Sequence, residues 1–230
     1  MPDTKFSWRG LREHLRQYWW LYLLGIAVSL VGTSLLWTMT EPRFSNQQCV
    51  SIALADSYTN PEPLQAFAPD ILARLQAEDD SIKQVTFESL MYNDELYTSS
   101  MLLLTRLSVG EHDAFLASQT AMDALVSSGV LVPLDEYVMA GWLGEYGLEP
   151  YVVTTEEEAD EEGAPGESVT WTAGLRLDSL DVLVQMGAFN NEGAFLCVAG
   201  NSGDIDTTMK ALEYLLSDLK EAAHAGTEAS

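Results

Sequence analysis

An uncharged run of 24 residues, QYWWLYLLGIAVSLVGTSLLWTMT at positions 17–40, limits the fold more than any other feature. At about 1.5 Å per residue, a helix over this run is longer than the roughly 30 Å hydrocarbon core of a bilayer. Aromatic residues flank it as they do at membrane–water interfaces, namely Tyr18, Trp19, Trp20, Tyr22 and Trp37. The run predicts one transmembrane helix over residues 18–40 that contacts the lipid bilayer, rather than a buried core helix.

The residues around this run predict an uncleaved signal anchor. The segment WTMTEPRFSNQ that ends the run contains no small-x-small cleavage site, and no lipid-attachment pattern precedes Cys49. Residues 1–17 carry four basic side chains, whereas only Arg43 follows the run closely. The positive-inside rule then predicts a single-pass plasma-membrane protein. Residues 1–17 are expected to be cytoplasmic and the C-terminal domain extracytoplasmic.

The remainder of the chain is strongly acidic. From residue 41 onward there are 33 acidic and 7 basic side chains, a balance that repels phosphate and excludes nucleic acid as a partner. The densest acidic segment, 156–168, lacks the ordered spacing of a calcium loop and is predicted to be a solvated, disordered loop. Cys49 and Cys197 each lie in or beside an apolar strand-like run and are predicted to be buried thiols.

Periodicity predicts one α/β domain over residues 49–222, after a polar linker at 41–48 and before a flexible tail at 223–230. Strands are expected near 50–55, 81–88, 113–117, 151–155, 169–177 and 193–199. Helices are expected near 69–77, 94–109, 119–128, 135–140 and 180–186, with a last helix capped by Asp204 or Asp206. This order predicts a single doubly wound lobe with a mostly parallel mixed sheet.

The sequence contains no recognisable catalytic or metal-binding pattern. His112 is the one histidine of the predicted domain outside the tail, and it stands between Glu111 and Asp113. Neighbours on an extended chain face opposite sides, so we expect an exposed turn here rather than an acid–base pair. No catalytic residue, metal site or cofactor is therefore predicted, and the protein is not expected to be an enzyme.

A candidate ligand site follows from the expected topology, because ligands of open α/β sheets bind beyond the carboxyl ends of the strands. Three strand–helix joints should meet there, and Tyr58 and Tyr92 would offer rings for stacking on a sugar. The candidate ligand-binding residues are Asp56, Ser57, Tyr58, Tyr92, Ser118, Gln119 and Thr120. The alternative is that they are only the caps and turns that such a fold requires.

Residues 102–138 resemble the first lobe of bacterial extracellular solute-binding proteins of the ABC-transporter type, also called periplasmic binding proteins. The sequence of these residues is LLLTRLSVGEHDAFLASQTAMDALVSSGVLVPLDEYV. The matching positions are Gly110, Asp113, Gly129, Pro133, Leu134 and Asp135. AFLCVAGNSGDIDTTMKALEYLLSD resembles the segment that returns from the second lobe in that family. The resemblance implies that the first and the returning strand flank the third, which places Cys49 and Cys197 too far apart for a disulfide, so they are expected not to be bonded to each other. It also implies a role in transport, through binding of a sugar, peptide or ion.

One departure from that family changes the expectation. Only a few residues separate Met186 from the returning strand at Gly193, which leaves no room for a second lobe. A small solute would then lie on an open shelf and bind weakly, with a membrane transporter as a possible partner. The alternative function is a non-catalytic interaction or scaffold module that docks another cell-envelope protein through the strand-end face or the acidic loop.

Overall fold

The computed structural model describes residues 8–40, 44–138, 141, 146–156, 168–177, 182–189 and 194–228. The chain divides into two compact units, Met1–Arg43 and Phe44–Ser230, and each is described by itself. The boundary falls within the linker predicted at 41–48. Part of that linker forms a short 3₁₀ helix, η1, at Asn46–Gln48.

The first unit contains the helix α1, Trp8–Thr40. Its backbone departs from helical geometry at Tyr18, with φ −118° and ψ 15°, which separates a basic first part from the apolar part. The segment Tyr18–Trp37 is long and apolar enough to cross a membrane, and none of it is buried within the protein. The single apolar helix predicted from the sequence is therefore confirmed, although the helix begins earlier, at Trp8.

The second unit is built on a six-stranded sheet with the order β2-β1-β3-β6-β5-β4. The strands are β1 (Cys49–Asp56), β2 (Gln84–Met91), β3 (Ala114–Ala117), β4 (Glu149–Glu156), β5 (Ser168–Arg176) and β6 (Phe195–Val198). β1 pairs in parallel with β2 and β3. β6 runs antiparallel to both β3 and β5, and β4 pairs antiparallel with β5.

The α/β class and the mixed sheet are confirmed, but the prediction of a mostly parallel sheet is wrong. Only the two pairings of β1 are parallel, and the other three are antiparallel. The physical reason is the connection between strands. β4 and β5 form a hairpin, and among the described residues the connection from β5 to β6 holds only a short helix, Val182–Gln185, so these neighbours run in opposite directions.

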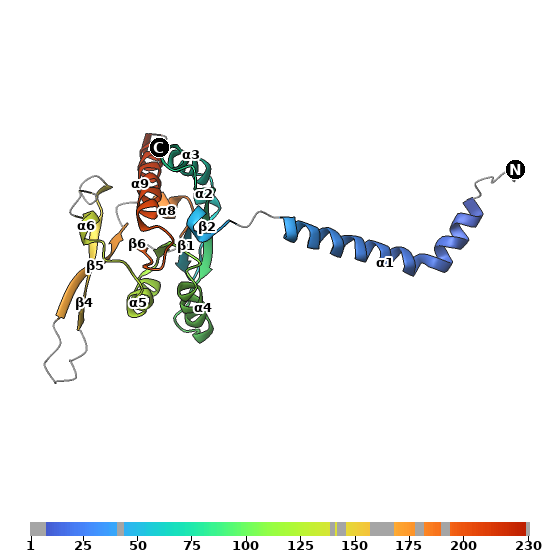
Figure 1. The fold of residues 1–230 in the computed structure, drawn as a ribbon, viewed down its shortest axis with the longest axis horizontal. Helices are drawn as coiled ribbons and strands as arrows, with labels where there is room; N and C mark the ends of the chain where they lie inside the picture. The colour runs from blue at the N-terminus through green and yellow to red at the C-terminus, as the bar shows by residue number, and fades with distance from the viewer. Residues whose placement is uncertain are drawn as a thin grey trace. The chain divides into compact units, whose positions relative to one another are not determined.

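Helices lie against both faces of this sheet. They are α2 (Glu62–Gln65), α3 (Ala68–Glu78), α4 (Tyr97–Ser108), α5 (Gln119–Ser127), α6 (Asp135–Tyr137), α8 (Val182–Gln185) and α9 (Ile205–Glu228). Side chains of β1 alternate between two buried clusters, as the pleat of a strand requires. Ile52 packs with α3 and α9, whereas Ala53 packs with α4 and α5. Figure 1 shows α3 and α9 on one side of the sheet and α4 and α5 on the other.

The last helix confirms one of the two caps predicted from the sequence. The Asp204 carboxylate accepts hydrogen bonds from the backbone N–H groups of Asp206 (3.1 Å) and Thr207 (3.4 Å), so Asp204 is the cap. Ion pairs join α9 to α3, Arg74 with Asp218 and Lys210 with Glu78. The helix continues to Glu228, so the tail predicted at 223–230 is helical over most of its length.

The cysteines agree with the expected strand order. β3 lies between β1 and β6, as the resemblance implied, and both Cys49 and Cys197 are free thiols. Cys197 is fully buried, which raises the pKa of its thiol, whereas Cys49 is only partly buried, so the prediction that both thiols are buried is wrong for Cys49. The acidic loop lies almost entirely outside the described residues, since only its ends are seen. Those ends, Glu156 and Ser168, pair with each other across the β4–β5 hairpin.

Candidate functional site

The structure brings the predicted strand-end residues together. β1, β2 and β3 are parallel neighbours, so their carboxyl ends lie at one edge of the sheet. Backbone hydrogen bonds join these ends: the Tyr92 N–H donates to the Asp56 carbonyl (2.8 Å), and the Ser118 N–H donates to the Ala55 carbonyl (2.9 Å). The three joints expected from the sequence therefore form one surface, the strand-end face, made of Asp56, Ser57, Tyr58, Tyr92, Ser118, Gln119 and Thr120.

The members of this face differ in exposure. Ser57, Tyr58, Gln119 and Thr120 are exposed, whereas Asp56, Tyr92 and Ser118 are buried. Tyr58 is 53% exposed and available for stacking. Tyr92 is only 5% exposed and packs in the core with leucines of α4, so its ring does not reach solvent as the stacking expectation required.

The buried polar groups of the strand-end face hold its turns. The Asp56 carboxylate accepts a hydrogen bond from the Ser57 N–H (2.6 Å), which fixes the chain as it leaves β1. Ser118 precedes α5, but its side chain does not cap the helix and lies instead 3.3 Å from the Thr120 hydroxyl. The first turn of α5 therefore receives no side-chain cap from Ser118, which leaves it suited to a polar or anionic group.

Tyr151 is a neighbour of this face that the sequence analysis missed. The Gln119 side-chain amide donates to the Tyr151 hydroxyl (3.2 Å) and to the Asp123 carboxylate (2.9 Å), and the Tyr151 hydroxyl donates to the same carboxylate (3.0 Å). Burial, and then the nearby Asp123, raise the pKa of Tyr151, so the hydroxyl keeps its proton. Gln119 and Asp123 are four residues apart on a helix and recognisable as a pair, but nothing local indicates that β4 brings Tyr151 to them.

A second polar cluster lies where the chain enters β3. The Asp113 carboxylate accepts hydrogen bonds from the backbone N–H groups of Ser51 (2.8 Å) and Gly203 (3.2 Å). The Asp113 backbone N–H donates to the Ser51 carbonyl (2.8 Å), and the Asp113 carbonyl accepts from the Ala199 N–H (2.9 Å), which ties the start of β3 to both neighbouring strands. Burial raises the pKa of Asp113 despite the two donors, which act in the opposite direction.

The expectation that His112 lies in an exposed turn is wrong, because its side chain is 0% exposed. Gly110 turns the chain with φ +65°, and the Asp113 N–H donates to the Ser51 carbonyl of β1, so the preceding residue, His112, is brought beside β1. Its Nδ1 lies 2.9 Å from the Ser51 hydroxyl oxygen, and its ring meets Phe115 edge-on at 5.8 Å. Burial lowers the pKa of His112, which keeps the ring neutral near pH 7.

Ser51 and His112 have the groups of an acyl-transfer site, but not its access. Ser51 is 9% exposed and His112 is 0% exposed, so a substrate carbonyl cannot approach the hydroxyl in this arrangement.

The side chain of His112 also comes close to two carboxylates. One ligand atom each from Glu88, Glu111 and His112 lies within 4.8 Å of the others. The sequence did not indicate this grouping because Glu88 is distant along the chain, on β2.

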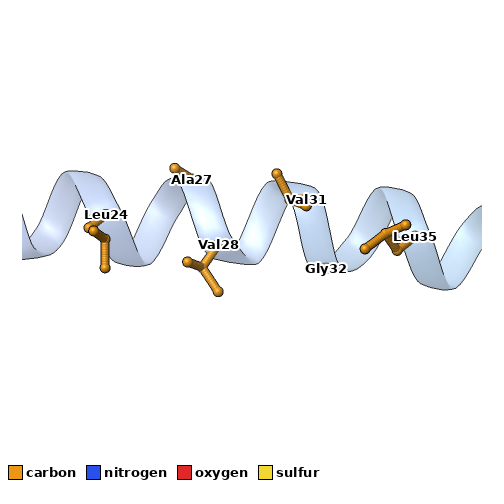
Figure 2. A pocket seen from close by; sticks show the side chains of 6 residues that line it. All are labelled: Leu24, Ala27, Val28, Val31, Gly32 and Leu35. Atoms are coloured by element: carbon orange, nitrogen blue, oxygen red, sulfur yellow. The ribbon is translucent and has the colours of Figure 1, made fainter.

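The apolar groove of α1 has a different character. It is lined by Leu24, Ala27, Val28, Val31, Gly32 and Leu35, spaced so that they share one side of the helix (Figure 2). One helix alone forms it, and its side chains offer no polar group to a ligand.

Comparison with protein-family models and with curated proteins finds no match to this chain. The structure thus defines its class as a six-stranded mixed α/β domain preceded by a long apolar helix.

Proposed function

We propose that this protein is a single-pass, membrane-anchored extracytoplasmic domain that binds a small polar solute weakly at the strand-end face. In this proposal the domain is a single doubly wound lobe of the solute-binding type. The observation that carries it is that Tyr58, Gln119 and Thr120, all exposed, follow the carboxyl ends of β1 and β3, which are neighbouring parallel strands. Such an edge is the usual ligand position in open α/β sheets.

The weakness of binding follows from the exposure of these groups. Pockets that hold small ligands tightly bury most of the ligand surface. The strand-end face instead presents exposed side chains, and one of them, Gln119, is already hydrogen-bonded to Tyr151 and Asp123. A solute therefore competes for the Gln119 amide and gains its contacts on one side only.

Solute binding predicts a measurable thermal stabilisation of the full chain in detergent micelles. We expect one member of a panel of sugars, amino acids and short peptides to stabilise the protein by about 1.4 kcal/mol at ten times its Kd. Tyr58→Ala should abolish this effect. The matched control is Tyr97→Ala, which removes a tyrosine that is 77% exposed and lies outside the face. The proposal fails if no member of the panel stabilises the protein, or if Tyr58→Ala responds as the wild type does.

A second candidate function is docking of another cell-envelope protein. Exposed apolar residues gather where β2 leads into α4, namely Met91 (69%), Leu96 (53%), Tyr97 (77%) and Met101 (47%). Contiguous exposed apolar surface is typical of protein–protein contacts. The same two variants separate the candidates, because docking would be weakened by Tyr97→Ala and left unchanged by Tyr58→Ala.

The membrane anchor predicts a specific protease pattern. The segment Tyr18–Trp37 spans about 30 Å as a helix, and basic residues precede it, so Phe44–Ser230 is expected outside the cytoplasm. We expect protease added to sealed spheroplasts to digest this unit, detected with an antibody against it. A cytoplasmic marker protein that stays intact is the control. A unit that survives in sealed cells and is digested only after lysis would show the opposite orientation.

A further inference from the structure

We propose that Glu88, Glu111 and His112 form a binding site for a divalent transition-metal ion with the ligand preferences of Zn²⁺. The three residues come from two places in the chain. Glu88 lies on β2, on the face of the sheet that α4 covers, and Glu111 and His112 lie in the connection from α4 to β3. One ligand atom of each lies within 4.8 Å of the others.

His112 is the residue that points to a metal ligand. Its Nδ1 is 2.9 Å from the Ser51 hydroxyl oxygen, whereas its Nε2 is buried and has no hydrogen-bond partner among the described residues. A buried polar atom without a partner costs roughly 1–3 kcal/mol. If Nδ1 carries the proton and donates it to Ser51, the Nε2 lone pair is free to bind a metal. Histidine ligands are commonly oriented in this way, by a hydrogen bond from the other ring nitrogen.

The two carboxylates are placed to complete the site. Ligand atoms about 2.0–2.2 Å from a tetrahedral Zn²⁺ lie roughly 3.3–3.6 Å from one another. The group must therefore contract, and its flexible members can do so: the side chains of Glu88 and Glu111 are 47% and 43% exposed. Three protein ligands with a fourth position left to water is a common arrangement for zinc.

The imidazole distinguishes this site from a calcium or magnesium site. Ca²⁺ and Mg²⁺ prefer oxygen ligands alone, whereas a mixed nitrogen and oxygen set suits Zn²⁺ and its neighbours in the transition series. The acidic character of the chain from residue 41 onward also attracts cations. We therefore expect Zn²⁺ to bind in the presence of millimolar Mg²⁺.

Arg106 is the competitor of the metal. Its Nη1 lies 3.9 Å from a Glu88 oxygen and its Nε lies 3.6 Å from a Glu111 oxygen, so it links the two carboxylates without a metal. Its side chain is 28% exposed, which leaves it a path to solvent when a metal takes its place. If pairing with Arg106 is the sole role of Glu88 and Glu111, replacing Arg106 creates no affinity for Zn²⁺. If the two glutamates are metal ligands, replacing Arg106 strengthens Zn²⁺ binding.

The test is Zn²⁺ titration of the full chain in detergent against a chromophoric chelator, with Co²⁺ absorption as a second readout of nitrogen coordination. We expect one high-affinity Zn²⁺ per chain. Glu111→Gln and Glu88→Gln should each weaken binding by at least about tenfold, and Arg106→Gln should strengthen it. Glu95→Gln is the matched control, since Glu95 is exposed and lies outside the cluster.

His112→Gln should also abolish binding, but it alters a buried position, so the exposed glutamate variants decide the matter. Unchanged Zn²⁺ affinity in both glutamate variants would overturn the proposal. Absence of a one-to-one site in the wild type, or weaker binding in Arg106→Gln, would overturn it as well. These outcomes are independent of solute binding at the strand-end face, which the Tyr58 variant tests.

Discussion

Replacement of Asp113 by alanine is expected to lower the free energy of unfolding by about 3–5 kcal/mol. Two hydrogen bonds to a charged acceptor contribute about 3–6 kcal/mol, and the cost of burying the carboxylate offsets part of this. The N–H groups of Ser51 and Gly203 would both lose their acceptor. Asp113 is 5% exposed, so water does not readily replace the carboxylate. The measurement is urea denaturation of the full chain in detergent, followed by circular dichroism.

Two variants make this result specific. Asp113→Asn keeps one acceptor oxygen but presents an amide nitrogen to the other donor, so we expect about half of the alanine effect. Asp94→Ala removes an exposed aspartate in the turn before α4 and should change stability by less than about 0.5 kcal/mol. Equal stability of Asp113→Ala and Asp94→Ala would show that the two backbone hydrogen bonds do not hold β1 and the segment before α9.

The pH dependence of the same variants follows from the raised pKa of Asp113. Burial lifts this pKa above its ordinary 3.8, so the folded state binds the proton more tightly than the unfolded state does. The contribution of the protonated Asp113 side chain to the free energy of unfolding is therefore fully present below the unfolded pKa. It is lost as pH rises through the folded pKa. We expect the stability of wild type relative to Asp113→Asn to decrease as pH rises above about 3.8. An increase over that range would contradict the assignment.

Replacement of Phe115 by alanine is expected to cost about 3–5 kcal/mol, as for other buried phenylalanines. Phe115 is 0% exposed in the middle of β3, where its neighbours on the adjacent strands are Ala53 and Cys197. Small residues on both sides mean that the ring fills space which they cannot fill. His112 also loses its edge-on contact with the ring.

The cavity explanation of the Phe115 effect has its own controls. Phe115→Leu conserves most of the volume and should cost less than about 1.5 kcal/mol. Val109→Ala truncates a side chain that is 65% exposed and should have little effect. The urea midpoint should be highest for the wild type, lower for Phe115→Leu and lowest for Phe115→Ala. The slope of the unfolding free energy against urea concentration should be unchanged. A Phe115→Leu variant as unstable as Phe115→Ala would indicate that ring contacts, rather than volume, determine stability here.

The sequence by itself determined the features that depend on neighbouring residues. The uncharged run at 17–40 predicted the apolar helix, because a membrane span needs only length and the absence of charge. Alternation and caps predicted most strands and helices of the domain, including the Asp204 cap of α9. The three strand–helix joints of the strand-end face were also predictable, since parallel strands bring their carboxyl ends to one edge.

Only the tertiary structure decided which groups meet and which are buried. Three of the five strand pairings are antiparallel, a direction that side-chain alternation does not encode. Tyr92 precedes Asn93 and His112 follows Glu111 in the sequence, yet both side chains are buried, Tyr92 against leucines of α4 and His112 against Phe115. Glu88 joins Glu111 beside His112 through the pairing of β2 with β1. These outcomes depend on contacts between residues far apart along the chain, whose energies local patterns do not report.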